Sequence, residues 1–338
     1  MRARLGQVYV MSKALTIAGL VLIVLAVTRA EAGAYPESWD MEWPKTDFTK
    51  TSVDLAEIFS GGPAKDGIPP IDAPTFLPVS EITDLGMQEP VIALHVNGEA
   101  RAYPLRVLMW HEIVNDEIAG VPVTVTYCPL CNSSIVFERT VDGVVLDFGT
   151  TGKLRNSDLV MYDRQTQSWW QQFLGQGIVG SMTGMTLKIL PSRLESFARF
   201  KQRAPYGKVL VAKAPGMRRY GTNPYVGYDS RDVPYDFFRG ELPEGINAMV
   251  RVVVIGEQAW SLPLLGSKGV ISVGEGMEII WQAGQNSALD SHEISKGRDV
   301  GNIVVRQRHG DLWLDVAHDI TFAFVFHAFH PNGVIHQN

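Results

Sequence analysis

The chain has 338 residues, of which 46% are hydrophobic, and its 30 Lys and Arg against 36 Asp and Glu give a net charge of −6. This charge argues against nucleic acid or an anionic membrane surface as a partner, because both need a basic face. The length is sufficient for one large hydrophobic core or two smaller ones.

The first 32 residues have the pattern of an export signal. Three basic residues precede an apolar run at 14–27, which is as long as a signal-peptide core and short for a membrane span. Residues 30–32 fit a small-residue cleavage site ending at Ala32, so we expect a periplasmic or secreted chain that begins near Gly33. An uncleaved anchor is the alternative. Cleavage would leave 26 basic and 35 acidic residues, a net charge of −9, and no later stretch long enough to span a bilayer.

The rest of the chain favours β-structure. Alternating or continuous apolar and β-branched residues predict strands at 91–96, 100–104, 121–127, 134–139 and 144–148. Asn97-Gly98 and Asp142-Gly143 are typical hairpin turns. Short helices are predicted at 105–111 and at 193–203, the second preceded by a capping-box pattern of Ser192 and Glu195. The expected fold class is mainly β with a few short helices (β-rich α+β).

Two pairs of segments resemble each other and indicate a duplication. Residues 91–105 resemble 250–264, and about 25 residues further on 125–133 resembles 279–287, with Gln282 and Gln285 opposite Cys128 and Cys131. Two related β-rich halves packed as one unit is the interpretation we favour, and coincidence is the alternative. In a duplicated chain the chemistry would be confined to the first half, and the second would serve as scaffold or wall.

This interpretation divides the chain into five parts. They are a signal peptide at 1–32, an N-terminal extension at 33–71, a first β-rich half at 72–210 that carries the cysteines, a Pro/Gly/Tyr-rich connecting loop at 211–245, and a second β-rich half without cysteines at 246–338. Long irregular segments are often binding loops. Tyr225, Tyr228 and Asp229 are therefore candidate ligand contacts, although their loop could equally be packed over the seam by its aromatic residues.

Cys128 and Cys131 are the only two cysteines, and they lie three residues apart. A disulfide stabilises mainly by closing a long loop of the unfolded chain, and this pair would close almost none. Redox exchange or metal ligation is the better explanation. The flanking residues predict a strand, a turn and a second strand, as in a metal knuckle, where Pro129 fixes φ and Asn132 tolerates a left-handed conformation.

A knuckle supplies two ligands, so a metal site needs more. Among eight histidines, His111 is the best placed in sequence, and His330, expected at a strand end, is the candidate fourth ligand. Two thiolates with imidazoles suit copper(I) or zinc, and soft sulfur favours copper. For most single histidines, a hydrogen-bonded structural role is the more frequent alternative.

Further polar residues are candidates for an outer role around this site. Glu112 and Asp116 could accept hydrogen bonds from the His111 ring, a common way to orient a metal-bound imidazole, and Asn115 lies between them. Asp158 lies in a polar turn sequence and is a further candidate. The sequence contains no Ser-His-Asp order, phosphate-binding loop or dinucleotide fingerprint.

Several motifs together resemble one family. They are 102–105 (AYPL), 111–116 (HEIVND), 120–123 (GVPV), 126–131 (TYCPLC), 157–163 (SDLVMYD) and 329–331 (FHP). Over 72–330 the chain therefore resembles the exported bacterial and archaeal family known as domain of unknown function 3179. The resemblance implies one family unit that spans both halves, and it implies no established activity. The family pattern has Gly after the second cysteine, from which Asn132 departs.

Three functions follow from these residues. The first is an exported protein that binds a transition metal through Cys128, Cys131, His111 and His330, for metal handling, electron transfer or metal-assisted oxidation. The second is a thiol–disulfide oxidoreductase in which Cys128 and Cys131 are the catalytic pair. The third is a non-catalytic module whose loop holds a ligand. The sequence leaves open whether the protein is an enzyme and which small molecule or metal-delivery partner it meets.

Overall fold

Most of the backbone lies in small β-sheets in the computed structural model, which describes residues 35–337. Strands hold 40% of the residues and helices 14%, which confirms the predicted mainly-β class. The five larger sheets have a propeller-like arrangement. The predicted signal peptide and its cleavage site lie outside the described residues. No helix within 35–337 is long and apolar enough to cross a bilayer.

The first sheet is built on the hairpin of β3 and β4. The turn predicted for this hairpin is confirmed, because Asn97 and Gly98 have φ values of 47° and 88°, as a two-residue hairpin turn requires. Strand β15 pairs antiparallel with β3, and β16 pairs parallel with β4. The order is β15 (Ser192–Ser196), β3 (Pro90–Val96), β4 (Glu99–Pro104), β16 (Lys208–Val211) and β2 (Thr75–Pro78).

The helices of this half are shorter than predicted. Helix α2 spans Leu105–Leu108, the start of the predicted 105–111 helix, and α3 spans Phe197–Arg203. The capping box before α3 is absent, because Ser192–Ser196 forms a strand against β3 and buries Leu194 there. Pairing with a sheet that already exists outweighs a local helix signal in this segment.

The second sheet carries the cysteine motif. Its order is β14 (Lys188–Leu190), β7 (Ser133–Glu138), β6 (Val121–Cys128) and β5 (Ile113–Ile118), all antiparallel. The strands predicted at 121–127 and 134–139 are therefore present. A two-stranded sheet follows, β8 (Thr140–Val141) and β9 (Val144–Val145), joined by the predicted turn at Asp142-Gly143.

The third sheet lies next along the chain. Its order is β1 (Phe59–Ser60), β10 (Phe148–Arg155), β11 (Asp158–Asp163), β12 (Trp169–Gln171) and β13 (Gln176–Val179). The N-terminal extension packs on this sheet through Trp39 and Trp43, which meet Trp169 in edge-to-face contacts. The extension also contains α1 (Ser38–Glu42) and the 3-10 helix η1 (Leu55–Glu57), whereas the 3-10 helix η2 (Val79–Glu81) follows β2 in the first half.

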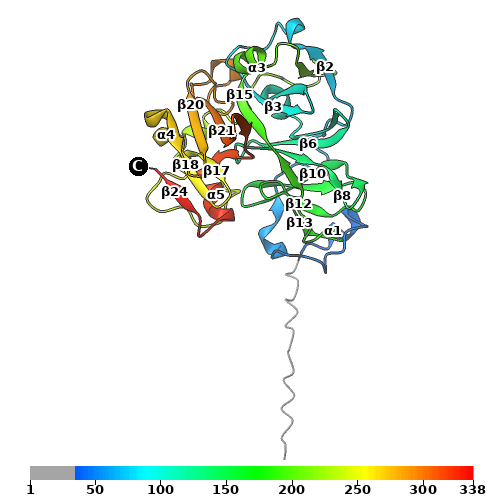
Figure 1. Ribbon diagram of the computed structural model, residues 1–338. Helices are drawn as coiled ribbons and strands as arrows, with labels where there is room; N and C mark the ends of the chain where they lie inside the picture. Colours follow the sequence, from blue (N-terminus) through cyan, green and yellow to red (C-terminus); the bar gives the residue numbers. More distant parts are fainter. Residues whose placement is uncertain (1–34, 338) are drawn as a thin grey trace, which may run out of the picture. The chain divides into compact units, whose positions relative to one another are not determined.

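Two further sheets follow the connecting segment, in which residues 212–250 contain only η3 (Tyr228–Ser230). One has the order β23 (Asp319–Phe322), β17 (Arg251–Ile255), β18 (Gln258–Ser261) and β24 (Val334–His336). The other has the order β19 (Val270–Ser272), β20 (Met277–Gln282), β21 (Asn302–His309) and β22 (Leu312–Asp315). Helices α4 (Leu262–Lys268), η4 (Ile294–Lys296) and α5 (Ala323–Phe329) complete this part, which Figure 1 colours from yellow to red.

The strand pairing repeats itself in the two halves. In the first, the β3–β4 hairpin leads through α2 into β5, β6 and β7, and the later β15–α3–β16 unit adds one antiparallel and one parallel strand to the hairpin. In the second, the β17–β18 hairpin leads through α4 into β19, β20 and β21, and β23–α5–β24 adds its strands in the same way. This repeated order supports the duplication inferred from sequence.

The halves are joined by reciprocal contacts and one shared core. Strand β23 of the second half packs against β7 of the first, and β15 of the first packs against β21 of the second. The largest cluster of buried apolar side chains runs continuously from Ile92 to Phe326 across both halves. The two halves are therefore packed as one unit, and the cysteine turn lies where β7 meets β23.

Candidate metal centre

The cysteine turn joins two strands, as its sequence predicted. Strand β6 ends on Cys128 and β7 begins at Ser133, which pairs with Cys128. The turn is closed by two backbone bonds, from Cys131 N to Cys128 O at 3.2 Å and from Asn132 N to Pro129 O at 3.2 Å. Asn132 takes the left-handed conformation expected of it, with φ of 53°. Both cysteines are buried and are not joined to each other.

A second turn, at the tip of the β10–β11 hairpin, meets the cysteines. Asn156 and Ser157 both have positive φ, 54° and 64°, which gives the tight two-residue turn of a hairpin. The carbonyl oxygen of Ser157 lies 3.7 Å from Cys128 Sγ and 3.4 Å from Cys131 Sγ. The turn also delivers Asp158, whose carboxylate oxygen and the two sulfurs all lie within 4.8 Å of one another.

Asp158 is fully buried and only half satisfied. Its Oδ2 accepts hydrogen bonds from Gln171 Nε2 at 2.6 Å and from Phe173 N at 2.9 Å. Its Oδ1 accepts no N–H or O–H hydrogen bond from any residue in the range 35–337, which is costly for a buried carboxyl group. Burial raises the pKa of Asp158 to about 7, against the opposing effect of these hydrogen bonds.

Glu112 adds a second buried carboxyl group close to this one. Its φ of 57° is unusual for a residue with a side chain, and its carbonyl accepts from Tyr127 N at 2.8 Å, which fixes it beside the start of β5. Burial raises the pKa of Glu112 to about 8, and the charge of Asp158 contributes to the rise. Strained backbone of this kind is concentrated at functional sites.

The thiols share this acidic environment. Burial raises the pKa of Cys128, and the nearby carboxyl groups of Asp158 and Glu112 add to the rise. Burial also raises the pKa of Cys131 well above its usual range. No Lys or Arg among residues 35–337 forms an ion pair with Asp158 or Glu112. Four acidic groups are therefore buried together without a basic partner in the described part of the chain.

Strand β23 of the second half holds the turn in place. The carbonyl of Cys131 accepts from Thr321 Oγ1 at 2.8 Å and from Phe322 N at 3.3 Å. Asn132 Nδ2 donates to Ile320 O at 2.9 Å, and Ser134 N donates to Asp319 Oδ1 at 2.9 Å. The second half thus supports the site with backbone and side-chain bonds.

The two predicted histidine ligands do not join the cysteines. His111 has both ring nitrogens occupied, Nδ1 at 2.7 Å from Pro69 O and Nε2 at 2.8 Å from Tyr220 Oη. His330 follows α5 rather than a strand, and its ring packs against Phe173 and Phe326. No histidine nitrogen within 35–337 forms a cluster with both sulfurs at the 4.8 Å spacing, so the third group beside them is Asp158.

The residues predicted to surround His111 divide between two roles. Asn115 is bound to Asp72 and to both backbone groups of Phe148, and Asp116 accepts from Arg101 Nη1 at 2.6 Å and Tyr103 Oη at 2.7 Å. Both therefore hold β5 against its neighbours. Glu112, in contrast, is buried near the cysteine cluster, where its charge contributes to the raised pKa of Cys128 and the charge of Asp158 contributes to its own.

The connecting loop contacts the same site. Tyr228 Oη donates to Leu130 O in the cysteine turn at 3.0 Å, and its ring stacks on Tyr235 at 4.4 Å. Tyr225 is half-buried, and burial raises its pKa with contributions from the charges of Glu112 and Cys128. The two tyrosines therefore lie beside the cysteine cluster.

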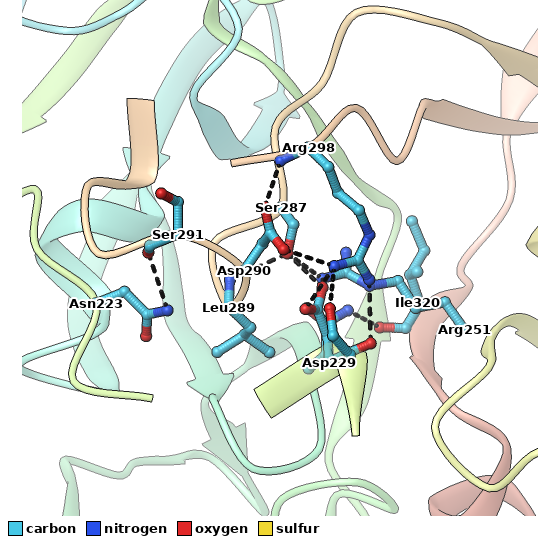
Figure 2. A network of polar contacts seen from close by, with 11 residues as sticks. Asn223, Asp229, Arg251, Ser287, Leu289, Asp290, Ser291, Arg298 and Ile320 are labelled. Atoms are coloured by element: carbon cyan, nitrogen blue, oxygen red, sulfur yellow. Dashed lines mark hydrogen bonds and ion pairs between the residues drawn. The ribbon is translucent and has the colours of Figure 1, made fainter. Parts of the chain in front are cut away.

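Asp229 anchors this loop to the second half (Figure 2). It is buried, and it accepts from Arg251 Nη2 at 2.8 Å, Ser287 Oγ at 2.5 Å and Arg298 Nη1 at 2.9 Å. Burial alone would raise the pKa of Asp229, but Arg251, Ser287 and Arg298 together lower it. Both oxygens of this carboxylate are used within the fold, so its role is structural.

Four more polar groups lie around the cysteine turn, and of their residues the sequence analysis singled out only Asn132, for its backbone conformation. These buried groups have no hydrogen-bond partner in the described part of the chain: Tyr127 Oη, Asn132 Oδ1, Ser133 Oγ and Ser157 Oγ. Buried polar groups are normally paired, so these four remain available to a ligand or to water. The sequence signal for Ser157 is its place in an Asn-Ser turn, where glycine is the usual second residue.

A family model described as "Protein of unknown function (DUF3179)" matches residues 65–333, which is most of the chain. The chain belongs to this family. Its motifs lie in both halves, in agreement with a single family unit. No curated protein and no solved structure matches the chain significantly.

Proposed function

We propose that this DUF3179 protein binds a transition metal ion through the thiolates of Cys128 and Cys131 and the carboxylate of Asp158. The observation that carries the proposal is the burial of these three groups and Glu112 with no basic partner among residues 35–337. A cation among them would displace the protons and compensate the buried charge. It would also occupy Oδ1 of Asp158, which has no hydrogen-bond partner in the part of the chain that the structure describes.

Copper(I) is the first candidate metal and zinc the second. Two thiolates are soft ligands and can satisfy copper(I) alone, whereas zinc is usually four-coordinate and would need Asp158 and one more ligand. The contribution of Asp158 therefore separates the two ions: it should be large for zinc and small for copper(I).

The burial of the site favours holding an ion over turnover at it. Cys128 is 2% exposed, and Cys131 and Asp158 are 0% exposed, whereas catalytic metal sites keep an open position for substrate. Metal handling or electron transfer is the role that this burial supports. Export, which the N-terminal pattern favours, would place thiolates in an oxidising compartment where ligation protects them.

Thiol–disulfide exchange is the second candidate, and Asp158 is the observation that favours it. A buried carboxyl group with a pKa near 7, beside Cys131, can accept the proton of a thiol that attacks a mixed disulfide. In such a cycle the two thiols lose two protons and two electrons to a substrate disulfide, which becomes two thiols. The burial of both sulfurs weighs against a protein substrate.

Elemental analysis of the exported protein, purified at pH 7 without chelators, tests the proposal. We expect about one copper or zinc ion per chain, lost in Cys128→Ser and retained in His111→Gln, the matched control. Metal-free protein whose cysteines form an easily reduced disulfide would favour the exchange activity instead. N-terminal sequencing of the same sample should give a start near Gly33.

A further inference from the structure

A cavity of about 310 Å³ lies away from the cysteines, between helix α2, strand β16 and the start of the connecting segment. Its walls include the apolar side chains of Leu85, Val107 and Leu210. Its volume is at the lower end of the range for small-molecule sites, which are concave and mostly apolar with a few polar groups. The polar groups here are mainly of one kind, since three arginines line the cavity.

These arginines are opposed by little negative charge. Arg106, Arg218 and Arg219 line the cavity together with a single acid, Asp84, so the lining has a net charge of +2. Arg106 Nε and Nη2 each lie 2.8 Å from a carboxylate oxygen of Glu89. Glu89 does not line the cavity, but its charge compensates that of Arg106. The Arg218 and Arg219 side chains have no hydrogen-bond or ion-pair partner among residues 35–337.

The segment that carries the two free arginines is fixed at its end. The Arg219 carbonyl accepts from Thr222 N at 3.0 Å and Thr222 Oγ1 at 2.7 Å. Tyr220 lines the cavity, and its ring stacks on His111 at 5.8 Å while its hydroxyl meets His111 Nε2. Two arginines next to the anchored Tyr220 therefore line the same cavity as these apolar side chains.

We propose that this cavity binds a small organic anion, with a carboxylate or phosphate head held by Arg218 and Arg219 and an apolar body against Val107 and Leu210. Guanidinium groups match both kinds of head with paired, charge-assisted hydrogen bonds. This site is separate from the cysteine cluster, and its occupation does not depend on a bound metal. It gives a role to the Tyr220–His111 pair, which the metal site does not use.

Calorimetric titration of the purified protein with four probes tests the site. Benzoate and phenyl phosphate carry the two kinds of head on the same apolar ring, benzamide removes the charge, and inorganic phosphate removes the ring. We expect saturable binding of benzoate or phenyl phosphate, with the stronger of the two identifying the head. Benzamide and inorganic phosphate should each bind at least about tenfold more weakly than their counterparts, because each lacks one half of the recognition.

Variants locate the binding. Arg218→Gln and Arg219→Gln should each weaken the stronger probe about tenfold, whereas Arg308→Gln, at an exposed arginine on β21, should leave it unchanged. The ring signals of His111 in NMR spectra should shift on binding in the parent protein. The proposal is overturned by an absence of saturable binding, by equal binding of benzamide, or by equal losses in Arg308→Gln and the two cavity variants. Metal content is measured in parallel, so this result is independent of the proposed metal site.

Discussion

The cysteine site and its counterpart in the second half have the same backbone hydrogen bond but different side chains. In the first half Tyr127 N donates to the carbonyl of Glu112 at 2.8 Å, and in the second half Trp281 N donates to the carbonyl of Gly269 at 2.8 Å. Both acceptors follow the short helix after the hairpin, and both have positive φ, 57° for Glu112 and 71° for Gly269. The same backbone position is thus occupied by the residue best suited to it in one half and by a buried acid in the other.

The first half therefore bears a conformational cost at Glu112 that the second half avoids with Gly269. Backbone with positive φ is disfavoured by roughly 1 kcal/mol for a residue with a side chain, and glycine avoids that cost. Cys128, which ends β6, corresponds to Gln282, which ends β20. The first half replaces glycine and glutamine by groups that can lose a proton, and it gathers them around Asp158. The second half keeps the fold without the acids.

The largest expected effect is the loss of metal affinity when either thiol, which the second half lacks, is removed. Cys128→Ser and Cys131→Ser should each weaken metal binding at least about 1,000-fold, because a hydroxyl group does not replace a thiolate as a ligand for these ions. Competition against a chelator of known affinity measures this loss. Gln282→Ser, at the corresponding position of the second half, is the control and should bind metal as the parent does.

The next effect concerns Asp158 and the choice of metal. Asp158→Asn should weaken zinc binding about a hundredfold and copper(I) binding less than about fivefold, since only zinc needs the carboxylate. Equal effects on both ions in the same chelator competition would contradict the assignment of copper(I) to the two thiolates.

The same substitution tests the buried charge through pH. The pKa values of Asp158 and Glu112 are raised by burial to about 7 and about 8, from ordinary values of 3.8 and 4.5. Between the ordinary and raised values the folded protein binds more protons than the unfolded chain, so stability falls as pH rises. We expect the unfolding free energy of metal-free protein to fall between about pH 5 and pH 8, and to fall less in Asp158→Asn. A profile that is flat or rises over this range in urea denaturation would show that the carboxyl groups are not buried as acids.

A smaller effect is expected from exchanging the residues at the shared positive-φ position. Glu112→Gly should stabilise the metal-free protein by about 1 kcal/mol at pH 8, and Gly269→Glu should destabilise it by at least about 1 kcal/mol. Glu112→Ala, which removes the acid and keeps the strain, should lie below Glu112→Gly in stability. If the unfolding free energy of Glu112→Gly were lower than that of the parent, Glu112 would carry no conformational cost from its positive φ.

The smallest effect is expected at the histidine that sequence placed in the site. His111→Gln should change metal affinity less than about twofold, because both ring nitrogens of His111 bind Pro69 and Tyr220. If chelator competition showed a loss of metal affinity close to that of the cysteine variants, His111 would have to be a metal ligand.

The local parts of this architecture were predictable from sequence. Alternating β-branched residues before Cys128 and a turn-forming Asn132 after Cys131 were enough to predict a strand, a turn and a strand. The duplication was also visible, and its alignment of Cys128 with Gln282 agrees with the strand pairing. The alignment fails beyond this point, because a loop at 283–301 replaces the four-residue cysteine turn, so Gln285 has no counterpart in it.

The partners of the cysteines were harder to predict because they are set by packing over long sequence distances. The polar turn sequence made Asp158 a candidate for an outer role only, and it reaches the sulfurs because a hairpin tip from another sheet meets the cysteine turn. His111 is close in sequence but is turned to Pro69 and Tyr220 by the end of α2. The helix predicted at 193–203 begins four residues late for the same kind of reason, since its first residues complete the sheet beside β3.

The central claim is that the two sulfurs and the Asp158 carboxylate bind one metal ion in place of their protons. Titration of the metal-free, reduced protein with copper(I) and with zinc at pH 7, followed by ultraviolet thiolate-to-metal absorption and by proton release, tests it most directly. We predict one ion per chain with at least about two protons released, because both thiols carry protons at this pH. Binding without proton release, or no binding above that of the double Cys128→Ser, Cys131→Ser variant, would contradict the claim.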